Sequence, residues 1–266
     1  MKSIFIAPIV FVLCCYCTAC NNTTSNTTDD NMPTQEKQLR DSISKHPDSL
    51  LLKENLIQYY RENSNYGQAL AETEKAIQNN SGSARLWDIK ATLYFLNKDT
   101  VNAARAFEKA IAIDPQPVYK ISLGLIYAQT KNAAAIILAD DLLKDSSAKA
   151  GKQAQFIKGF YYSYLGDYQK AISFFDTCLA IDYTYTDAYK EKAICLYNLT
   201  KYKEAIASLE KAVALQSTYD EAYYWLGRCY EKINQPKDAI MNYQAAIQID
   251  PDYAEAKDRL ARLGVK

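Results

Sequence analysis

The chain has 266 residues and carries 31 basic and 31 acidic side chains, so its formal net charge is zero. Proteins whose main partner is nucleic acid need a clustered excess of basic residues, and the even balance argues against that partner. Glycine is scarce, at 8 residues, which is typical of a chain that is mainly helical.

Residues 1–19 have the pattern of an export signal. Lys2 supplies the positive charge, and the apolar run that follows is too short to span a bilayer as a helix. The segment from Cys17 to Cys20 reads Cys-Thr-Ala-Cys and resembles a bacterial lipobox, in which small residues precede the cysteine that becomes acylated. A lipobox more often has leucine where Cys17 stands. We predict lipidation, by palmitate or a similar chain, at Cys20, and an ordinary cleaved signal peptide is the alternative.

Residues 21–34 are polar and low in complexity, and they cannot bury enough apolar surface to become ordered. With the lipidated Cys20 they form a predicted disordered tether, residues 20–34. The composition resembles that of lipoproteins of the Bacteroidetes, in which an acidic run directly after the lipidated cysteine marks surface export. Here Asp29 and Asp30 come later. The resemblance therefore implies a lipid anchor in the bacterial cell envelope, in the outer membrane and facing the periplasm.

The remainder of the chain repeats every 34 residues, and residues 220–253 show the unit most clearly. Apolar and small residues are spaced to share one face in each of two helices. These are Tyr223, Leu226, Gly227 and Tyr230 in the first helix and Ala239, Tyr243 and Ala246 in the second. Pro236 and Pro251 break the chain before and after the second helix.

Two positions of the second helix hold a small residue in five of the six repeats. A small residue is needed where a helix approaches its neighbours closely, because a larger side chain would overpack the contact. From the last repeat to the first, the earlier position holds Ala239, Ala205, Ala171, Ile137, Ala103 and Ala69, and the later position holds Ala246, Ala212, Cys178, Lys144, Ala110 and Ala76. A register that stays in phase through six repeats argues against a helical bundle with chance spacing.

This pattern resembles the tetratricopeptide repeat, a helix pair with Trp-x2-Leu-Gly-x2-Tyr in its first helix and Ala, an aromatic residue, Ala and a closing Pro in its second. The resemblance implies an all-α fold, a right-handed superhelix of about six stacked repeats within residues 35–264. The repeat at 118–151 is degenerate, because Ile137 and Lys144 replace small residues. The predicted parts are a leading half-repeat from residue 35, repeats at 50–83, 84–117, 118–151, 152–185, 186–219 and 220–253, and a capping helix at 254–264.

The folded part offers no set of residues for catalysis. His46 is the only histidine, and it precedes Pro47 at a predicted helix end, so a Ser-His-Asp triad or a zinc site has too few members. Glycine-rich phosphate-binding motifs are absent, which argues against a nucleotide ligand. The adjacent carboxylates Asp140 and Asp141 are more typical of a solvated helix face than of acid–base chemistry. We therefore expect no enzyme activity, no cofactor and no metal.

Three cysteines fall within the predicted repeats. Cys178 occupies a small-residue position of a second helix, and Cys195 and Cys229 hold equivalent positions in the first helices of neighbouring repeats. We expect buried, small apolar side chains at all three positions. A disulfide between Cys178 and Cys195, which an oxidising periplasm permits, is the alternative.

The resemblance implies a protein-interaction scaffold or adaptor, since the first helices of this family line a concave groove that holds a segment of a partner protein. An apolar or amphipathic segment suits the residues of this groove, because aromatic residues and arginine dominate interface hot spots. Two alternatives stay open: the aromatic rings pack against one another, or the groove is a ligand- or glycan-binding module. The positions assigned to partner binding are Phe156, Phe160, Tyr164, Lys190, Ile194, Tyr197, Tyr224 and Arg228.

Overall fold

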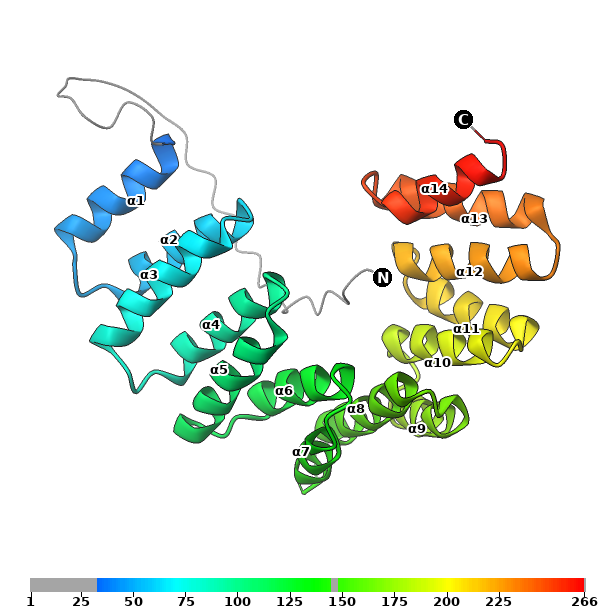
Figure 1. Ribbon diagram of the computed structural model, residues 1–266, viewed down its shortest axis with the longest axis horizontal. Helices are drawn as coiled ribbons and strands as arrows, with labels where there is room; N and C mark the ends of the chain where they lie inside the picture. The colour runs from blue at the N-terminus through cyan, green and yellow to red at the C-terminus, as the bar shows by residue number, and fades with distance from the viewer. Residues whose placement is uncertain (1–32, 145–147, 266) are drawn as a thin grey trace.

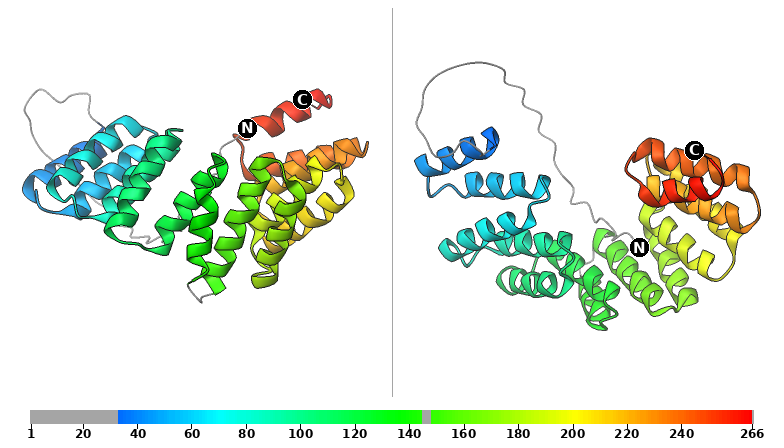
Figure 2. Two further views of the ribbon diagram at one scale, coloured as in Figure 1. Left: turned by 60° about the horizontal axis from the view of Figure 1, so that its bottom comes forward. Right: turned by 45° about the horizontal axis from the view of Figure 1, so that its top comes forward.

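The computed structural model describes residues 33–144 and 148–265, and α-helices are the only regular secondary structure in that part of the chain. The helices follow one another around an open arc with α1 at one end and α14 at the other (Figure 1; Figure 2). In chain order they are α1 (Thr34–Lys45), α2 (Leu50–Glu62), α3 (Tyr66–Asn79), α4 (Ala84–Leu96), α5 (Thr100–Ile113), α6 (Pro117–Gln129), α7 (Ala134–Leu142), α8 (Ala148–Leu165), α9 (Tyr168–Ile181), α10 (Thr186–Asn198), α11 (Tyr202–Leu215), α12 (Asp220–Lys232), α13 (Pro236–Ile249) and α14 (Ala254–Arg262).

Short polar side chains set the starts of several helices. Ser49, Ser83 and Asp99 each accept a hydrogen bond from the backbone N–H three residues further on. These bonds satisfy helix-end donors that lack a partner within the helix. Proline occupies the first turn of α6 and of α13, where the missing N–H would have no helical partner anyway. The helix starts are therefore encoded locally in the sequence.

One residue with a positive φ ends the turn between the two helices of each pair from α2–α3 to α12–α13. These residues are Ser64, Lys98, Lys131, Gly166, Thr200 and Asn234, with φ between 55° and 86°. The left-handed backbone reverses the chain, and the next N–H donates back to a carbonyl of the first helix, as from Asn65 to Tyr60 at 2.8 Å. The period of 34 residues is kept at every one of these turns except Lys131, which comes one residue early.

The small residues of the second helices are buried where helices meet, as the sequence pattern predicts. In the first of the two positions, Ala69, Ala103, Ala171, Ala205 and Ala239 are each 0% exposed. The glycines of the first helices allow a still closer approach. A Cβ atom at Gly227 would lie 2.5 Å from a ring carbon of Tyr243, and one at Gly159 would lie 2.7 Å from the ring of Phe175. Only glycine permits these two contacts, because a side chain cannot interpenetrate a ring.

The third pair, α6–α7, departs from the predicted register, and the expectation of an unbroken phase through six repeats is wrong there. Ala135 and Leu142, which are buried together with Ala139, take the two repeated positions of α7 and lie two residues before the predicted Ile137 and Lys144. Ile137 is instead 71% exposed. The shift has two parts. The turn at Lys131 comes one residue early, and the segment between this turn and the buried alanine is one residue shorter than in the other pairs.

The helix after this shift also differs from the prediction. We expected the fourth repeat to begin near Lys152, but α8 begins at Ala148 and is 18 residues long. Its Ile157 packs directly against α6, where a Cβ atom at Gly124 would lie 2.9 Å from the end of the Ile157 side chain. The additional residues of α8 compensate for the early position of α7, so the period of 34 residues is restored from Ala171 onward.

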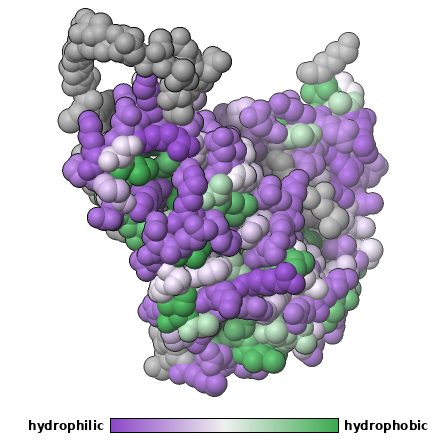
Figure 3. Space-filling view, turned by 60° about the vertical axis from the view of Figure 1, so that its left-hand side comes forward, coloured by the Kyte–Doolittle hydropathy of each residue, from purple (hydrophilic) through white to green (hydrophobic). Residues whose placement is uncertain are grey.

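The ends of the arc are covered by single helices. His46 caps the C-terminus of α1 and is exposed to solvent, as predicted. At the other end, Ala256 and Leu260 of α14 are buried, while its Lys257 and Asp258 face solvent. Seen from the side of the N-terminal helices, the surface is mainly hydrophilic, and its apolar side chains form small separate patches (Figure 3). This is the surface that a stack of repeats needs to stay in water.

We predict that Gly227→Ala lowers the free energy of unfolding by about 1 to 3 kcal/mol, although alanine is the better helix former, because the new methyl group overlaps the Tyr243 ring. Gly67→Ala is the matched control, since no atom lies within 4 Å of the added Cβ at this helical position. Chemical denaturation of both variants tests the contact. Equal stabilities of the two variants would show that α12 and α13 are further apart than described.

The shifted register of α7 makes a second prediction. Leu142→Ala is expected to lower the free energy of unfolding by about 2 to 4 kcal/mol, because it leaves a cavity in the core. Ile137→Ala removes an exposed side chain and is expected to change it by less than about 0.5 kcal/mol. Urea unfolding followed by circular dichroism measures both values, and the opposite order would restore the register predicted from the sequence.

Candidate functional site

The eight residues assigned to partner binding lie on α8, α10 and α12, and they divide into two groups. The side chains of Phe156, Phe160, Lys190 and Tyr224 are buried, with exposed fractions of 7%, 4%, 3% and 9%. The remaining four, Tyr164, Ile194, Tyr197 and Arg228, are partly exposed. We call these four residues the exposed set. Three of the buried four, Phe156, Phe160 and Lys190, can act on a partner only by supporting it.

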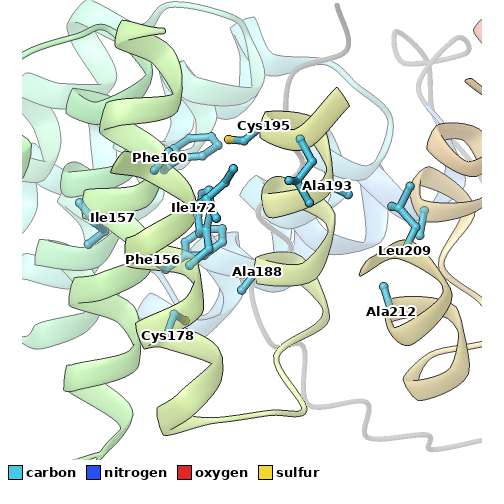
Figure 4. Close-up of a cluster of buried hydrophobic side chains, with 14 of the residues drawn as sticks. Phe156, Ile157, Phe160, Ile172, Cys178, Ala188, Ala193, Cys195, Leu209 and Ala212 are labelled. Atoms are coloured by element: carbon cyan, nitrogen blue, oxygen red, sulfur yellow. The ribbon is translucent and has the colours of Figure 1, made fainter. Parts of the chain in front are cut away.

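The two phenylalanines of α8 belong to the core between α8, α9 and α10 (Figure 4). The rings of Phe156 and Phe160 are stacked with centroids 5.8 Å apart, and Phe156 also contacts Phe175 at 5.7 Å. Tyr164 meets the edge of Phe160 at 4.9 Å. For these rings the alternative of mutual packing describes the structure, because neighbouring helices cover the face on which they lie.

Lys190 is the centre of a buried ionic network between α10 and α12. Its Nζ lies 2.5 Å from a carboxylate oxygen of Glu221 and 3.3 Å from one of Glu191. Burial by itself would lower the pKa of Lys190, but the charge of Glu191 and its neighbours outweighs this and raises it well above its usual value. The hydroxyl of Tyr219 donates to Asp187 at 2.5 Å. These groups hold two repeats together and leave no free charge at Lys190.

Arg228 occupies a different environment on α12. Its guanidinium donates to the hydroxyl of Tyr224 and to the hydroxyl of Tyr197, both at 3.1 Å. It also lies 5.3 Å from the ring centres of Tyr197 and Trp225 and 5.8 Å from that of Tyr224, which are cation–π distances. Trp225 was not among the predicted site residues. Trp225 directly follows Tyr224 in the sequence. This second aromatic residue in the same helical turn was the signal that could have identified it.

The first helices of the N-terminal repeats carry a smaller polar cluster. Arg85 forms a two-pronged ion pair with Glu54 of the preceding repeat, at 2.7 and 2.8 Å. Asp88, one turn further along α4, faces Arg85 and Tyr119. Burial raises the pKa of Asp88 to about 6, against a smaller opposing effect of the Arg85 charge.

The three cysteines are buried free thiols, so the disulfide between Cys178 and Cys195 is not formed. Each of the three, Cys229 included, is 0% exposed, and burial raises its pKa to about 12. A thiol that stays protonated is a poor nucleophile and a poor metal ligand. The interpretation of these residues as small apolar side chains is confirmed.

No group of three or more His, Cys, Asp or Glu side chains within residues 33–144 and 148–265 is placed to hold a metal ion. None of the helices from α1 to α14 combines the length and apolar character that crossing a bilayer requires. The predicted signal, residues 1–19, and the predicted lipidation site, Cys20, lie outside the described residues.

Comparison with known families agrees with the helix pairs. Four models of the tetratricopeptide repeat match the chain, at residues 55–116, 153–185, 195–234 and 220–253. The chain therefore contains tetratricopeptide repeats, as the sequence pattern predicts. These matches leave out residues 117–152, which hold the shifted pair α6–α7.

Solved structures share the fold. A tetratricopeptide repeat protein from Parabacteroides merdae is 18% identical, with a TM-score of 0.73 over 86% of this chain and 91% of that one. PilW, a type IV pilus biogenesis factor, is 19% identical, with a TM-score of 0.62 over 79% of this chain and 97% of that one. TTC0263 of Thermus thermophilus is 17% identical, with a TM-score of 0.60 over 68% and 98%. At these identities the likeness shows the fold alone, and no curated protein matches the sequence.

These comparisons confirm the all-α solenoid of tetratricopeptide repeats. Such repeats are in general scaffolds for protein–protein interaction, and proteins built from them are typically not enzymes. None of the four matching family models describes a catalytic domain.

The raised pKa of Asp88 predicts a pH dependence of stability. Because the folded state holds this proton more tightly than the unfolded state, the free energy of unfolding should fall as the pH rises from about 4 to about 6. Asp88→Asn removes this loss, so the variant should be more stable than the wild type by about 1 to 2 kcal/mol at pH 7 and equal to it near pH 4. Denaturation at several pH values measures the difference.

Asp182→Asn is the control of opposite sign for this pH experiment. The hydrogen bond from Lys152, at 2.6 Å, lowers the pKa of Asp182 to about 2, and the side chain and backbone of Thr184 add to the effect. Asp182 therefore stabilises the folded state at neutral pH, and its variant should lose stability there. A difference between wild type and Asp88→Asn that is the same at pH 4 and pH 7 would contradict the raised pKa.

Proposed function

We propose that the protein is a lipid-anchored scaffold of the bacterial cell envelope, which binds a segment of a protein partner across the first helices of its last three complete repeats. The observation that carries this proposal is the exposed set. It lies on α8, α10 and α12 and combines two tyrosines with an isoleucine and an arginine, of which Ile194 and Arg228 hold equivalent positions. Large amphipathic side chains of these kinds supply most of the binding energy at protein interfaces.

The alternative, a ligand- or glycan-binding module, has weaker support. Rings that stack against a sugar have to present a face to solvent. Phe156, Phe160 and Tyr224 do not, because they are buried against other side chains. The half-buried tyrosines and the aliphatic Ile194 suit a peptide segment better, and a segment can lie across several repeats at once.

The anchor is the second part of the proposal. An apolar run followed by Cys-Thr-Ala-Cys supports lipidation at Cys20, and the polar residues 21–34 would hold the repeats away from the membrane. Because this resembles the lipoproteins of the Bacteroidetes, we place the anchor in the outer membrane with the repeats in the periplasm. PilW, a type IV pilus biogenesis factor, has a similar fold.

Partner capture tests the scaffold. The full chain would be extracted from membranes with its bound proteins, and a partner in near-equal amount is expected. Ile194→Ala combined with Tyr197→Ala should weaken its capture about tenfold or more, because both side chains face the partner. Met241→Ala is the control, since it removes a 65% exposed side chain from α13, a second helix that carries none of the residues assigned to partner binding. Capture that is unchanged in the double variant would place the partner elsewhere.

Fractionation tests the anchor independently. Cys20→Ala should release the protein from the membrane fraction or leave its signal uncleaved, because no acyl chain can be attached. The wild-type protein should stay with the membranes after a salt wash and enter the detergent phase. A Cys20→Ala variant that still sediments with washed membranes would show that another segment holds the protein there.

A further inference from the structure

Arg228 is a half-buried cation without a counter-charge among the residues that the structure describes. No carboxylate of residues 33–144 and 148–265 forms an ion pair with it. The acidic residue nearest along α12, Glu231, is engaged elsewhere: it accepts a hydrogen bond from Tyr243 at 2.9 Å and pairs with Arg259 at 3.4 Å. A partly desolvated charge with no opposite charge is costly to keep in a folded protein.

The same face of the first helices neutralises its other central cations. Arg85 pairs with Glu54, and Lys190 pairs with Glu221, and in both cases the two partners are 31 residues apart in adjacent repeats. At that spacing from Arg228 lie Tyr197, which offers a hydroxyl in place of a carboxylate, and Arg259, which is itself a cation. Neither position supplies a counter-charge to Arg228.

The polar groups around Arg228 keep hydrogen-bond donors that no described residue accepts. The guanidinium has more N–H groups than its bonds to Tyr197 and Tyr224 use. Each tyrosine hydroxyl accepts from Arg228, so its own hydrogen points away, and neither donates to any group in the described part of the chain. A cation surrounded by unused donors fits an anion, and the planar guanidinium fits a carboxylate best.

The surroundings suit an acidic side chain within a longer segment. Lys232, one turn beyond Arg228 on α12, is exposed and adds positive charge. On the other side, Ile194 lies at the equivalent position of α10 and is partly exposed. Trp225 borders the guanidinium at 5.3 Å. An aliphatic side chain on α10 thus lies at the position equivalent to that of the arginine on α12.

We propose that Arg228, with the hydroxyls of Tyr197 and Tyr224, binds the carboxylate of an aspartate or glutamate side chain within the partner segment. An apolar neighbour of that residue would lie on Ile194. This inference rests on the proposed scaffold function and names the chemistry of the partner. It also gives Arg228 a role that packing between α10 and α12 does not require, since a neutral side chain could fill that space.

The intrinsic fluorescence of the protein offers a direct assay. The chain has two tryptophans, so Trp87→Phe leaves Trp225 as the only one, beside the proposed site. The full-length Trp87→Phe protein would be titrated with the peptide Ala-Leu-Glu-Leu-Ala, blocked at both ends, at up to millimolar concentrations. Two further probes are the blocked peptide with glutamine in place of glutamate, and the glutamine peptide with a free C-terminal carboxylate.

The glutamate peptide should give a saturable change in Trp225 fluorescence that weakens as salt is added. The blocked glutamine peptide should bind about tenfold more weakly or worse, because it brings no charge. Arg228→Gln should weaken binding of the glutamate peptide by a similar factor. Lys232→Gln, the matched control for charge, should change it by only about twofold, since this lysine is exposed.

Two conservative variants separate binding from folding. Arg228→Lys keeps the charge without the planar fork, and Tyr197→Phe with Tyr224→Phe keeps the rings without the hydroxyls. Both should weaken the glutamate peptide while the circular dichroism spectrum and melting temperature stay near those of the parent protein. Weakening that follows a loss of helicity in all of these variants would overturn the proposal and leave Arg228 a structural group.

Other results would also overturn it. One is the absence of any fluorescence response to the glutamate peptide, and another is equal binding of the glutamate and glutamine peptides. A third is tighter binding of the peptide with a free C-terminal carboxylate, which would assign the site to a chain end. Partner capture distinguishes this failure from failure of the scaffold. If Arg228→Gln retains the partner while the Ile194 and Tyr197 double variant loses it, the scaffold stands and the carboxylate site does not.

Discussion

The close approach of helices at small residues is the contact on which the rest of this structure depends. Small residues at the two repeated positions of every second helix except α7, together with Gly159 and Gly227 in first helices, let backbones meet at distances that larger side chains forbid. Each repeat buries its apolar face only against its neighbours, so these contacts set the angle between successive pairs. The open arc of Figure 1 is the sum of these local contacts.

The fixed period brings side chains of neighbouring repeats together on the face formed by the first helices. Residues 31 apart in adjacent first helices come into contact, as Tyr197 and Arg228 do. Two such meetings are ion pairs that neutralise both partners, Glu54 with Arg85 and Lys190 with Glu221. Arg228 meets a tyrosine instead, and its remaining donors are left for a ligand. Interaction chemistry thus arises where one member of a repeated pair is replaced.

The pair α6–α7 shows how a solenoid tolerates a defect. Its turn comes early at Lys131 and its second helix is only 9 residues long, yet α6 regains contact with the stack by packing Gly124 directly against Ile157 of α8. The exposed Ile137 is the visible result of the shift. Since coupling between repeats is local, the register is restored within one repeat, and the C-terminal pairs keep their regular contacts.

The sequence by itself determined the helix pairs, their period, the small-residue contacts and the caps, because each depends on spacing within one repeat or on residues next to a helix end. The shift at Ile137 was decided by the tertiary structure, since a compensated loss of two residues leaves the overall period unchanged. The same holds for the site. Sequence placed Phe160 and Arg228 in equivalent positions of one face, but burial depends on what a neighbouring helix covers. Packing therefore put Phe160 in the core and left Arg228 at the surface.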